Sequence, residues 1–232
     1  NDYRAPAAPS LADVQTNLFG NGTAAAQAFF PFESLNRYYH RASEGLLNLQ
    51  GNVLGVHHFP NNRSSYQPAT SDPTARNQAI FDMVREALNS LDASGHDFAQ
   101  YDNDGDGYID AITILYQGPP AGWGTFWWAY HWSFFVNDAD LNAWDGRKLK
   151  KFVFSPVTGR GAGSTDYDPR GMCHQMGHLL GLPDYFDYTP ATLPKGGVGG
   201  LDMMDGSKGN HNAFSRWVLD WIAPAVVGSG AP

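Results

Sequence analysis

The chain has 232 residues with a formal net charge of −8, and 42% of its residues are hydrophobic while 16% are charged. This length allows one large domain, with or without two lobes, and the negative charge argues against a nucleic-acid or anionic-membrane partner. No apolar run approaches the ~20 residues of a membrane span. The single cysteine, Cys173, excludes an intrachain disulfide.

Periodicity and turn residues predict a mixed α/β chain after an extended lead-in at residues 1–26. The clearest helix is 74–91, where apolar residues recur at helical spacing. Residues 46–58, which alternate across Gly51 as two strands or one bulged strand would, are expected to be β structure. The other expected elements are a helix at 32–40, strands at 111–116 and 148–154, a helix from Asp168 to Gly181, a loop at 188–200, a tight turn at 201–206 and a helix at 213–222.

The segment HQMGHLLGLPD, from His174 to Asp184, indicates a metal site. On a helix His174 and His178 project from the same face, one turn apart, so both imidazoles reach one ion. Gly181 suits the left-handed turn that ends such a helix, and the chain then doubles back to bring Asp184 to the same ion. Two imidazoles and one carboxylate leave a fourth tetrahedral position on zinc, which is a catalytic arrangement.

An acidic loop, DNDGDGYID, follows the predicted helix at 74–91 and suggests a second cation site. Asp102, Asp104, Asp106 and Asp110 alternate with small residues, which allows a tight loop to wrap oxygens around one hard cation, and calcium is the expected ion. Thr113 stands where an EF-hand carries glutamate, so the EF-hand pattern is not met. The alternative is a solvated acidic turn.

An aromatic segment at residues 123–135 holds four tryptophans, Tyr130 and His131. These rings would form either part of the core or a wall of a substrate cleft. His131 is expected to be a hydrogen-bonded structural residue. His211, which follows the turn at 201–206, is a candidate that would approach the zinc site and stabilise an oxyanion.

The segments HQMGHLLGLPDYFD and GGVGGLDMMDGS together resemble the immune-inhibitor-A family of M6 metallopeptidases, which are metzincin-like zinc peptidases. Softer landmarks in the same order are SEGLLNLQGNVLGV, YDNDGDGYIDAITILYQGP, WWAYHW and FSRWVLDWIAP. The resemblance implies a zinc endopeptidase with His174, His178 and Asp184 as ligands, protein or peptide substrates, a pro-segment and secretion. We expect a monomer, with signal and pro-segment absent from this chain.

The family fold implied by this resemblance is mixed α/β (α+β): a twisted mixed sheet with the active-site helix, and a loop-rich lower subdomain with a methionine turn. We expect one catalytic domain over residues 1–232, with an upper subdomain at about 1–181 and a lower one at 182–232. Met204, in the methionine turn at residues 201–206, matches the methionine that packs beneath the zinc in metzincins.

Gln175 departs from the family pattern, because a glutamate at this position accepts a proton from zinc-bound water. Glutamine cannot take that proton, and loss of a general base typically removes ~10² to 10⁴ in rate. We therefore expect the chain to bind zinc and substrate but to cleave poorly. Gln175 is either an engineered inactivating change or the mark of a natural pseudo-peptidase, which would act as a metal-stabilised protein-binding module.

Overall fold

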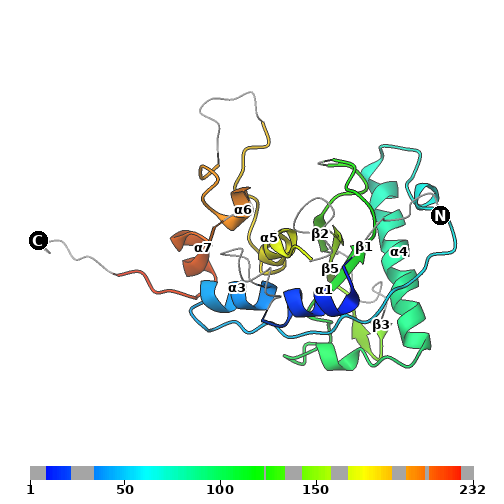
Figure 1. Cartoon of the computed structure of the whole chain (residues 1–232), viewed down its shortest axis with the longest axis horizontal. Coiled ribbons are helices and arrows are strands. Elements are labelled where there is room, and N and C mark those ends of the chain that lie inside the picture. The colour runs from blue at the N-terminus through cyan, green and yellow to red at the C-terminus, as the bar shows by residue number, and fades with distance from the viewer. Residues whose placement is uncertain are drawn as a thin grey trace, which may run out of the picture. The chain divides into compact units, whose positions relative to one another are not determined.

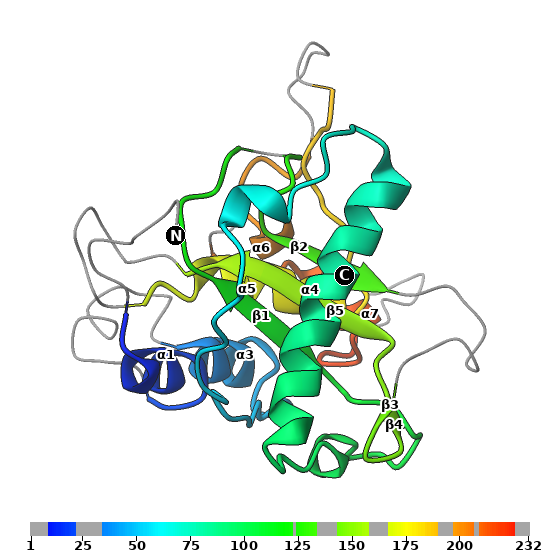
Figure 2. The same ribbon diagram turned by 90° about the vertical axis from the view of Figure 1, so that its right-hand side faces the viewer.

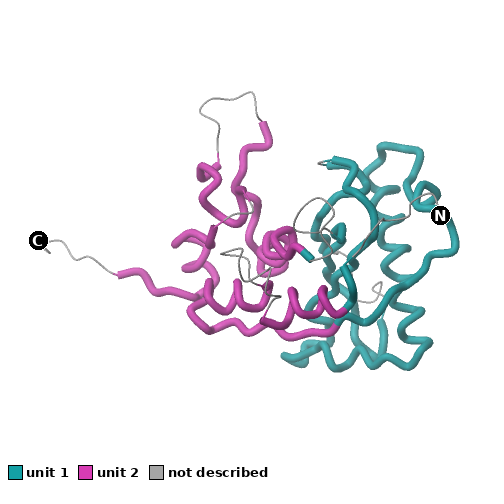
Figure 3. The backbone as a smooth tube through the Cα atoms, in the orientation of Figure 1, with its two compact units in different colours: residues 1–11, 53–167 teal, residues 12–52, 168–232 magenta. Residues whose placement is uncertain are grey.

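Helices and short strands make up the computed structural model of the chain (Figure 1), which describes residues 9–21, 34–122, 124–133, 143–157, 167–189, 197–206 and 209–225. The contacts divide it into two compact units (Figure 3). Unit 1 comprises Asn1–Leu11 and Val53–Tyr167, and unit 2 comprises Ala12–Asn52 and Asp168–Pro232. These units do not coincide with a division near residue 181, and the assignment of the whole chain to a single catalytic domain stays a prediction.

A mixed three-stranded sheet lies at the centre of unit 1. Its strand order is β1-β5-β2, with β1 (Ile112–Tyr116) parallel and β2 (Tyr130–Ser133) antiparallel to β5 (Lys151–Pro156). The short strands β3 (Ala143–Trp144) and β4 (Arg147–Lys148) form a separate antiparallel pair. The mixed sheet therefore confirms the expected α/β class at this level.

Helix α4 (Pro73–Ala93) lies across one face of this sheet (Figure 2). It begins where predicted, because the Asp72 carboxylate accepts a hydrogen bond from the backbone N–H of Thr74 at 3.0 Å and Pro73 occupies the first turn. Its apolar stripe packs with the inner residues of the strands into one core, which includes Ile80, Met83, Val84, Leu88, Ile112, Phe152 and Phe154. Two 3₁₀ turns, Arg63–Ser65 and Ala99–Tyr101, flank the helix in sequence.

The described part of the aromatic segment contributes to this core. Trp127 is buried, and the Arg63 guanidinium lies 4.2 Å from the centroid of its ring. Tyr130 and Trp132 are partly buried against the same cluster, and His131 is within hydrogen-bonding distance of Ser133 Oγ at 2.8 Å. The core interpretation of these rings is therefore favoured, while Trp123 lies outside the described residues.

The described residues of unit 2 form five short helices. They are α1 (Leu11–Leu18), α3 (Leu35–Ala42), α5 (Arg170–Leu179), α6 (Met203–Gly206) and α7 (Ala213–Val218). Helix α5 packs against α3 and α6. Its buried face, together with Tyr38, Tyr39, Met203 and Met204, forms the core of this unit. The thiol of Cys173 is buried there, as expected of a packed residue.

Four secondary-structure expectations differ from the structure. The lead-in at residues 1–26 is not extended throughout, because residues 11–18 form helix α1, which buries Val14 and Leu18. Residues 46–58 form no strand: alternation stabilises a strand only when the backbone pairs with a neighbouring strand, and no described strand pairs with these residues. The turn at 201–206 contains the short helix α6. Helix α7 ends at Val218, since Leu219 caps it and Asp220 takes a left-handed φ of 56°. No helix among the described residues has the length and apolar content needed to cross a membrane.

Candidate metal centre

Helix α5 begins and ends through local signals in the sequence. The Asp168 carboxylate accepts a hydrogen bond from the backbone N–H of Arg170, the first residue of the helix, at 3.1 Å, while Pro169 occupies the N-cap position. At the other end Gly181 has a φ of +98°, and its N–H bonds the His178 carbonyl at 2.9 Å. The N–H of Leu182 bonds the Gly177 carbonyl at 3.0 Å, which completes a Schellman motif. The chain reversal then carries Asp184 back to the helix.

Three ligand-type atoms converge at this reversal. Asp184 Oδ1 lies 2.9 Å from His174 Nε2 and 3.3 Å from His178 Nε2. The ligand atoms of the three side chains lie within 4.8 Å of one another. A tetrahedral ion with bonds of ~2.0–2.2 Å separates its ligand atoms by roughly 3.4 Å. The observed separations are therefore close to the edges of a tetrahedron around one ion.

Backbone carbonyls fix the orientation of both imidazoles. His174 Nδ1 lies 2.9 Å from the carbonyl oxygen of Met203, and His178 Nδ1 lies 2.8 Å from that of Leu182. A carbonyl can only accept, so each Nδ1 carries the proton and each Nε2 of a neutral ring presents a lone pair. Two lone pairs and a carboxylate oxygen then face one another, an arrangement that a cation stabilises.

The electrostatics of the cluster agree with its need for positive charge. Burial opposes a charge on His178, but contacts with Asp184 and the Leu182 carbonyl outweigh it and raise the pKa of His178. Burial also favours the neutral form of Asp184, yet His174, His178 and the hydroxyl of Tyr188 lower the pKa of Asp184 well below its usual value. Tyr188 donates its hydroxyl to Asp184 Oδ2, so that oxygen is oriented away from the shared position.

Gln175 follows the first histidine on α5 and is buried, with 5% of its surface exposed. Its Oε1 has no hydrogen-bond partner among the described residues. A buried amide oxygen without a partner costs free energy comparable to a lost hydrogen bond. A water molecule or substrate group bound at the centre would supply the missing donor, so this orphaned atom fits a site that is completed by additional groups.

The methionine turn packs beneath α5 at Gly177. A Cβ placed on Gly177 would lie 3.2 Å from Met204 Cε and closer than 3.0 Å to Met204 Sδ. Met203 and Met204 are both fully buried. The carbonyl of Met203 accepts the hydrogen bond from His174 Nδ1, whereas the side chain of Met204 contacts the helix. These contacts fit the expected assignment of Met204 as the packing methionine, which stays a prediction.

His211 is buried within unit 2. Its ring lies 5.6 Å from that of Tyr39 and 5.9 Å from those of Tyr38 and Trp221, and its Nε2 is 3.3 Å from the Tyr39 hydroxyl. Burial, the largest cause, lowers the pKa of His211 to about 4. The imidazole therefore has the surroundings of a packed, neutral residue, and its role in stabilising an oxyanion stays a prediction.

In unit 1 the acidic loop brings together carboxylates of Asp102, Asp104 and Asp106, whose ligand atoms lie within 4.8 Å of one another. Arg147 Nε lies 2.5 Å from Asp102 Oδ2, while Asp102 Oδ1 is buried without a hydrogen-bond partner among the described residues. Asp110 is not in this group, and its Oδ2 accepts hydrogen bonds from the backbone and side chain of Asn103. Part of the predicted cation site is therefore assembled.

The sequence predicted the three side chains that converge here, whose role as metal ligands stays a prediction, but it did not predict the groups that orient them. The carbonyls of Met203 and Leu182 and the hydroxyl of Tyr188 contact the ligands, and Asp202 holds the methionine turn. Backbone carbonyls leave no residue signature, so no pattern could have singled out the first two. The DMMD sequence around Asp202 offered the single usable hint.

Comparisons with known proteins bear on this centre. A family model for the immune inhibitor A peptidase M6 catalytic domain matches residues 10–209. The chain is 26% identical over 198 residues to Immune inhibitor A of Bacillus thuringiensis subsp. alesti, covering 73% of this chain and 28% of that protein. It is 27% identical over 237 residues to Pre-pro-metalloprotease PrtV of Vibrio cholerae serotype O1 (strain M66-2), covering 85% of this chain and 24% of that protein. The chain thus spans about a quarter of the length of these curated relatives.

Proposed function

Because the chain belongs to the immune inhibitor A family of M6 peptidases, we propose that it is the catalytic domain of a secreted, zinc-dependent endopeptidase that acts on proteins or peptides. The observation that carries the proposal is the convergence of His174 Nε2, His178 Nε2 and Asp184 Oδ1, with both Nδ1 protons held by carbonyls. Zinc matches this combination of two imidazoles and one carboxylate, and leaves room for a further ligand.

A zinc ion at this centre would supply a Lewis acid that polarises a peptide carbonyl and makes a water molecule acidic. The three side chains would hold the ion, and the Met203 and Leu182 carbonyls would keep both imidazoles in the tautomer that presents Nε2. Gln175 can hydrogen-bond a water molecule but cannot accept its proton. This chain would therefore bind substrate and lack the general base of hydrolysis.

Two measurements test the proposal. Elemental analysis should find about one zinc per chain at the centre. The Gln175→Glu variant should cleave denatured casein ~10² to 10⁴ faster than the unaltered chain, because a carboxylate at position 175 restores the general base. The matched control combines Gln175→Glu with His178→Ala, which removes a ligand and should abolish cleavage. A Gln175→Glu variant that binds zinc but cuts no faster than its control would contradict the proposal.

Glutamine in place of the glutamate base at position 175 suggests a second candidate function, a metal-stabilised module that binds proteins or peptides without cutting them. The two candidates share the zinc centre, so zinc content does not separate them. The residue encoded at position 175 in the source genome does: glutamate would mark Gln175 as an engineered change, whereas glutamine would favour the binding module. We favour the engineered change, because the three ligands and Met204 are all retained.

We also propose that the acidic loop of unit 1 binds calcium as a structural ion. Arg147 offsets the charge of only one of three carboxylates that lie within 4.8 Å of one another, and Asp102 Oδ1 is a buried acceptor without a partner among the described residues. Asp110 would join the site only if its carboxylate turned from Asn103. Calcium binding, secretion and a monomeric state complete the proposed description of the domain.

A further inference from the structure

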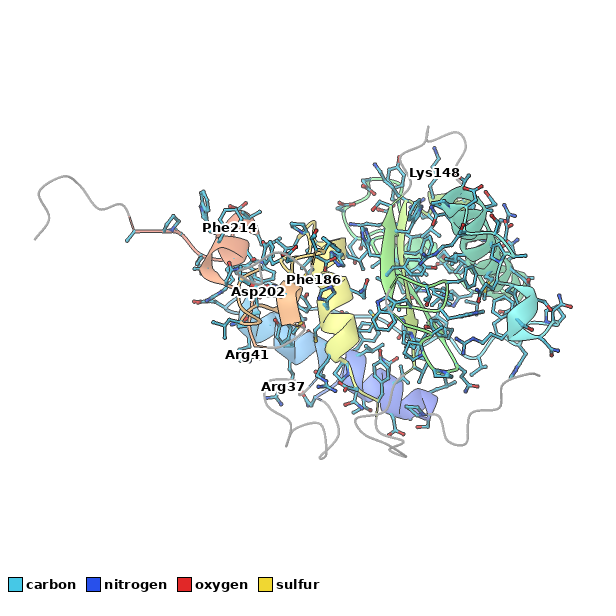
Figure 4. All side chains as sticks on the ribbon, turned by 90° about the horizontal axis from the view of Figure 1, so that it is seen from above. Arg37, Arg41, Lys148, Phe186, Asp202 and Phe214 are labelled. Carbon is cyan, nitrogen blue, oxygen red and sulfur yellow. The ribbon has the colours of Figure 1, made fainter. Side chains whose placement is uncertain are left out.

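Asp202, labelled in Figure 4, is a buried carboxylate directly before α6. Its Oδ1 accepts a hydrogen bond from the backbone N–H of Met204 at 2.6 Å, and its Oδ2 accepts one from the backbone N–H of Asn212 at 2.5 Å. Its side chain is fully buried, and the imidazole of His211 lies with Nδ1 3.9 Å from Oδ1. The carboxylate thus uses both oxygens to hold two backbone segments.

One of those N–H groups belongs to the peptide unit that orients His174. The N–H of Met204 and the carbonyl of Met203 are the two ends of a single planar group. The carbonyl end accepts the Nδ1 proton of His174 at 2.9 Å, and the N–H end is held by Asp202. Because the peptide unit is rigid, fixing one end fixes the direction of the other.

The charge of Asp202 acts along the same path. Hydrogen bonds in series polarise one another, so a carboxylate at the N–H end makes the carbonyl at the other end a stronger acceptor. A stronger acceptor at Nδ1 makes Nε2 of the same ring a better electron donor to a metal. An asparagine at position 202 would supply one acceptor instead of two and would carry no charge.

We propose that Asp202 is a positioning residue of the metal centre, which orients and polarises His174 through the Met203–Met204 peptide group. In many metal sites a carboxylate accepts the second ring N–H of a ligating histidine directly. Here the Met203–Met204 peptide group lies between the carboxylate and the histidine. This inference rests on the proposed zinc function, since it assigns His174 Nε2 to the metal. It also explains why a carboxylate is buried here without a lysine or arginine partner in the described part of the chain.

The test compares two variants that remove one carboxylate each from neighbouring positions. Asp202→Asn should weaken zinc binding by about 10- to 100-fold, measured by competition with a chromogenic chelator. Asp205→Asn is the matched control, because Asp205 Oδ2 accepts the N–H groups of Val198 and Gly200 at 3.0 and 2.6 Å instead of supporting a ligand. The control should bind zinc as the unaltered chain does. Equal zinc affinity for the two variants would overturn the proposal.

A spectroscopic readout separates orientation of His174 from general loss of structure. In the cobalt-substituted protein, Asp202→Asn should shift the visible absorption bands, whereas Asp205→Asn should leave them unchanged. If Asp202→Asn does not fold, long-range ¹⁵N–¹H NMR of the unaltered, metal-free chain decides. The chain of hydrogen bonds from Asp202 through the Met203–Met204 peptide group to His174 predicts the Nδ1–H tautomer of His174. A dominant Nε2–H tautomer would refute the proposal. Failure of the unaltered chain to bind zinc would instead contradict the proposed function.

Discussion

The contact between α5 and the methionine turn makes a quantitative prediction for Gly177→Ala. The added Cβ would lie closer than 3.0 Å to Met204 Sδ and 3.4 Å from His211 Cε1. Met204 is fully buried, so its side chain cannot swing out into solvent to make room. Gly171, on the same helix, has nothing within 4 Å of the corresponding position and provides a matched control.

Two opposing terms set the magnitude. Replacing glycine by alanine within a helix stabilises it by up to about 1 kcal/mol, whereas forcing a methyl group into a packed core costs about 1–3 kcal/mol. Gly171→Ala carries the first term alone and should be neutral or stabilising. Gly177→Ala carries both, so it should be less stable than Gly171→Ala by about 1–3 kcal/mol.

Urea denaturation of the metal-free chains, followed by far-UV circular dichroism, measures this difference as a change in midpoint at constant m-value. Repeating Gly177→Ala in a Met204→Ala background removes the obstructing side chain. The methyl group should then be tolerated, which gives a coupling free energy of about 1–3 kcal/mol between the two positions. Equal stability of the Gly171→Ala and Gly177→Ala variants would refute the packing of Met204 against the helix.

Three further predictions concern ions and pH. His178→Ala should abolish stoichiometric zinc binding, because it removes one of the three proposed ligands. Equilibrium dialysis with elemental analysis measures the bound zinc. Zinc retained by this variant would count against His178 as a ligand of the proposed centre. Burial lowers the pKa of His211 to about 4, so below about 6.5 the unfolded chain takes up a proton that the folded chain refuses. The stability that neutral His211 contributes is therefore complete above pH about 6.5 and is lost as the pH falls toward 4. The urea midpoint should fall less steeply with decreasing pH in His211→Phe than in the unaltered chain. Identical pH profiles for the two proteins would contradict the assignment of His211 as a buried, neutral residue. Calcium should raise the melting temperature of the chelator-treated chain through the acidic loop, and Asp104→Asn should reduce that rise; an unchanged melting temperature would exclude a structural ion.

Local sequence determined much of the candidate metal centre. His174 and His178 stand four residues apart, and the helix that carries them ends at a glycine with positive φ. Helix spacing and the Schellman reversal are properties of neighbouring residues, so they follow from the sequence without knowledge of the fold. The same holds for α4, whose cap and apolar stripe are local signals. Gln175 was likewise identified from sequence, and its effect on catalysis is a chemical inference.

Tertiary structure decided what surrounds those residues. The Met203 carbonyl reaches His174 from 29 positions away, and Tyr39 donates its hydroxyl to the Cys173 carbonyl from 134 positions away. Residues 46–58 alternate as a strand does but have no strand partner in the described chain. Such pairings depend on chain segments distant in sequence, and backbone carbonyls are the same at every residue. The sequence therefore predicted which three side chains converge, while only the fold decided which groups orient them.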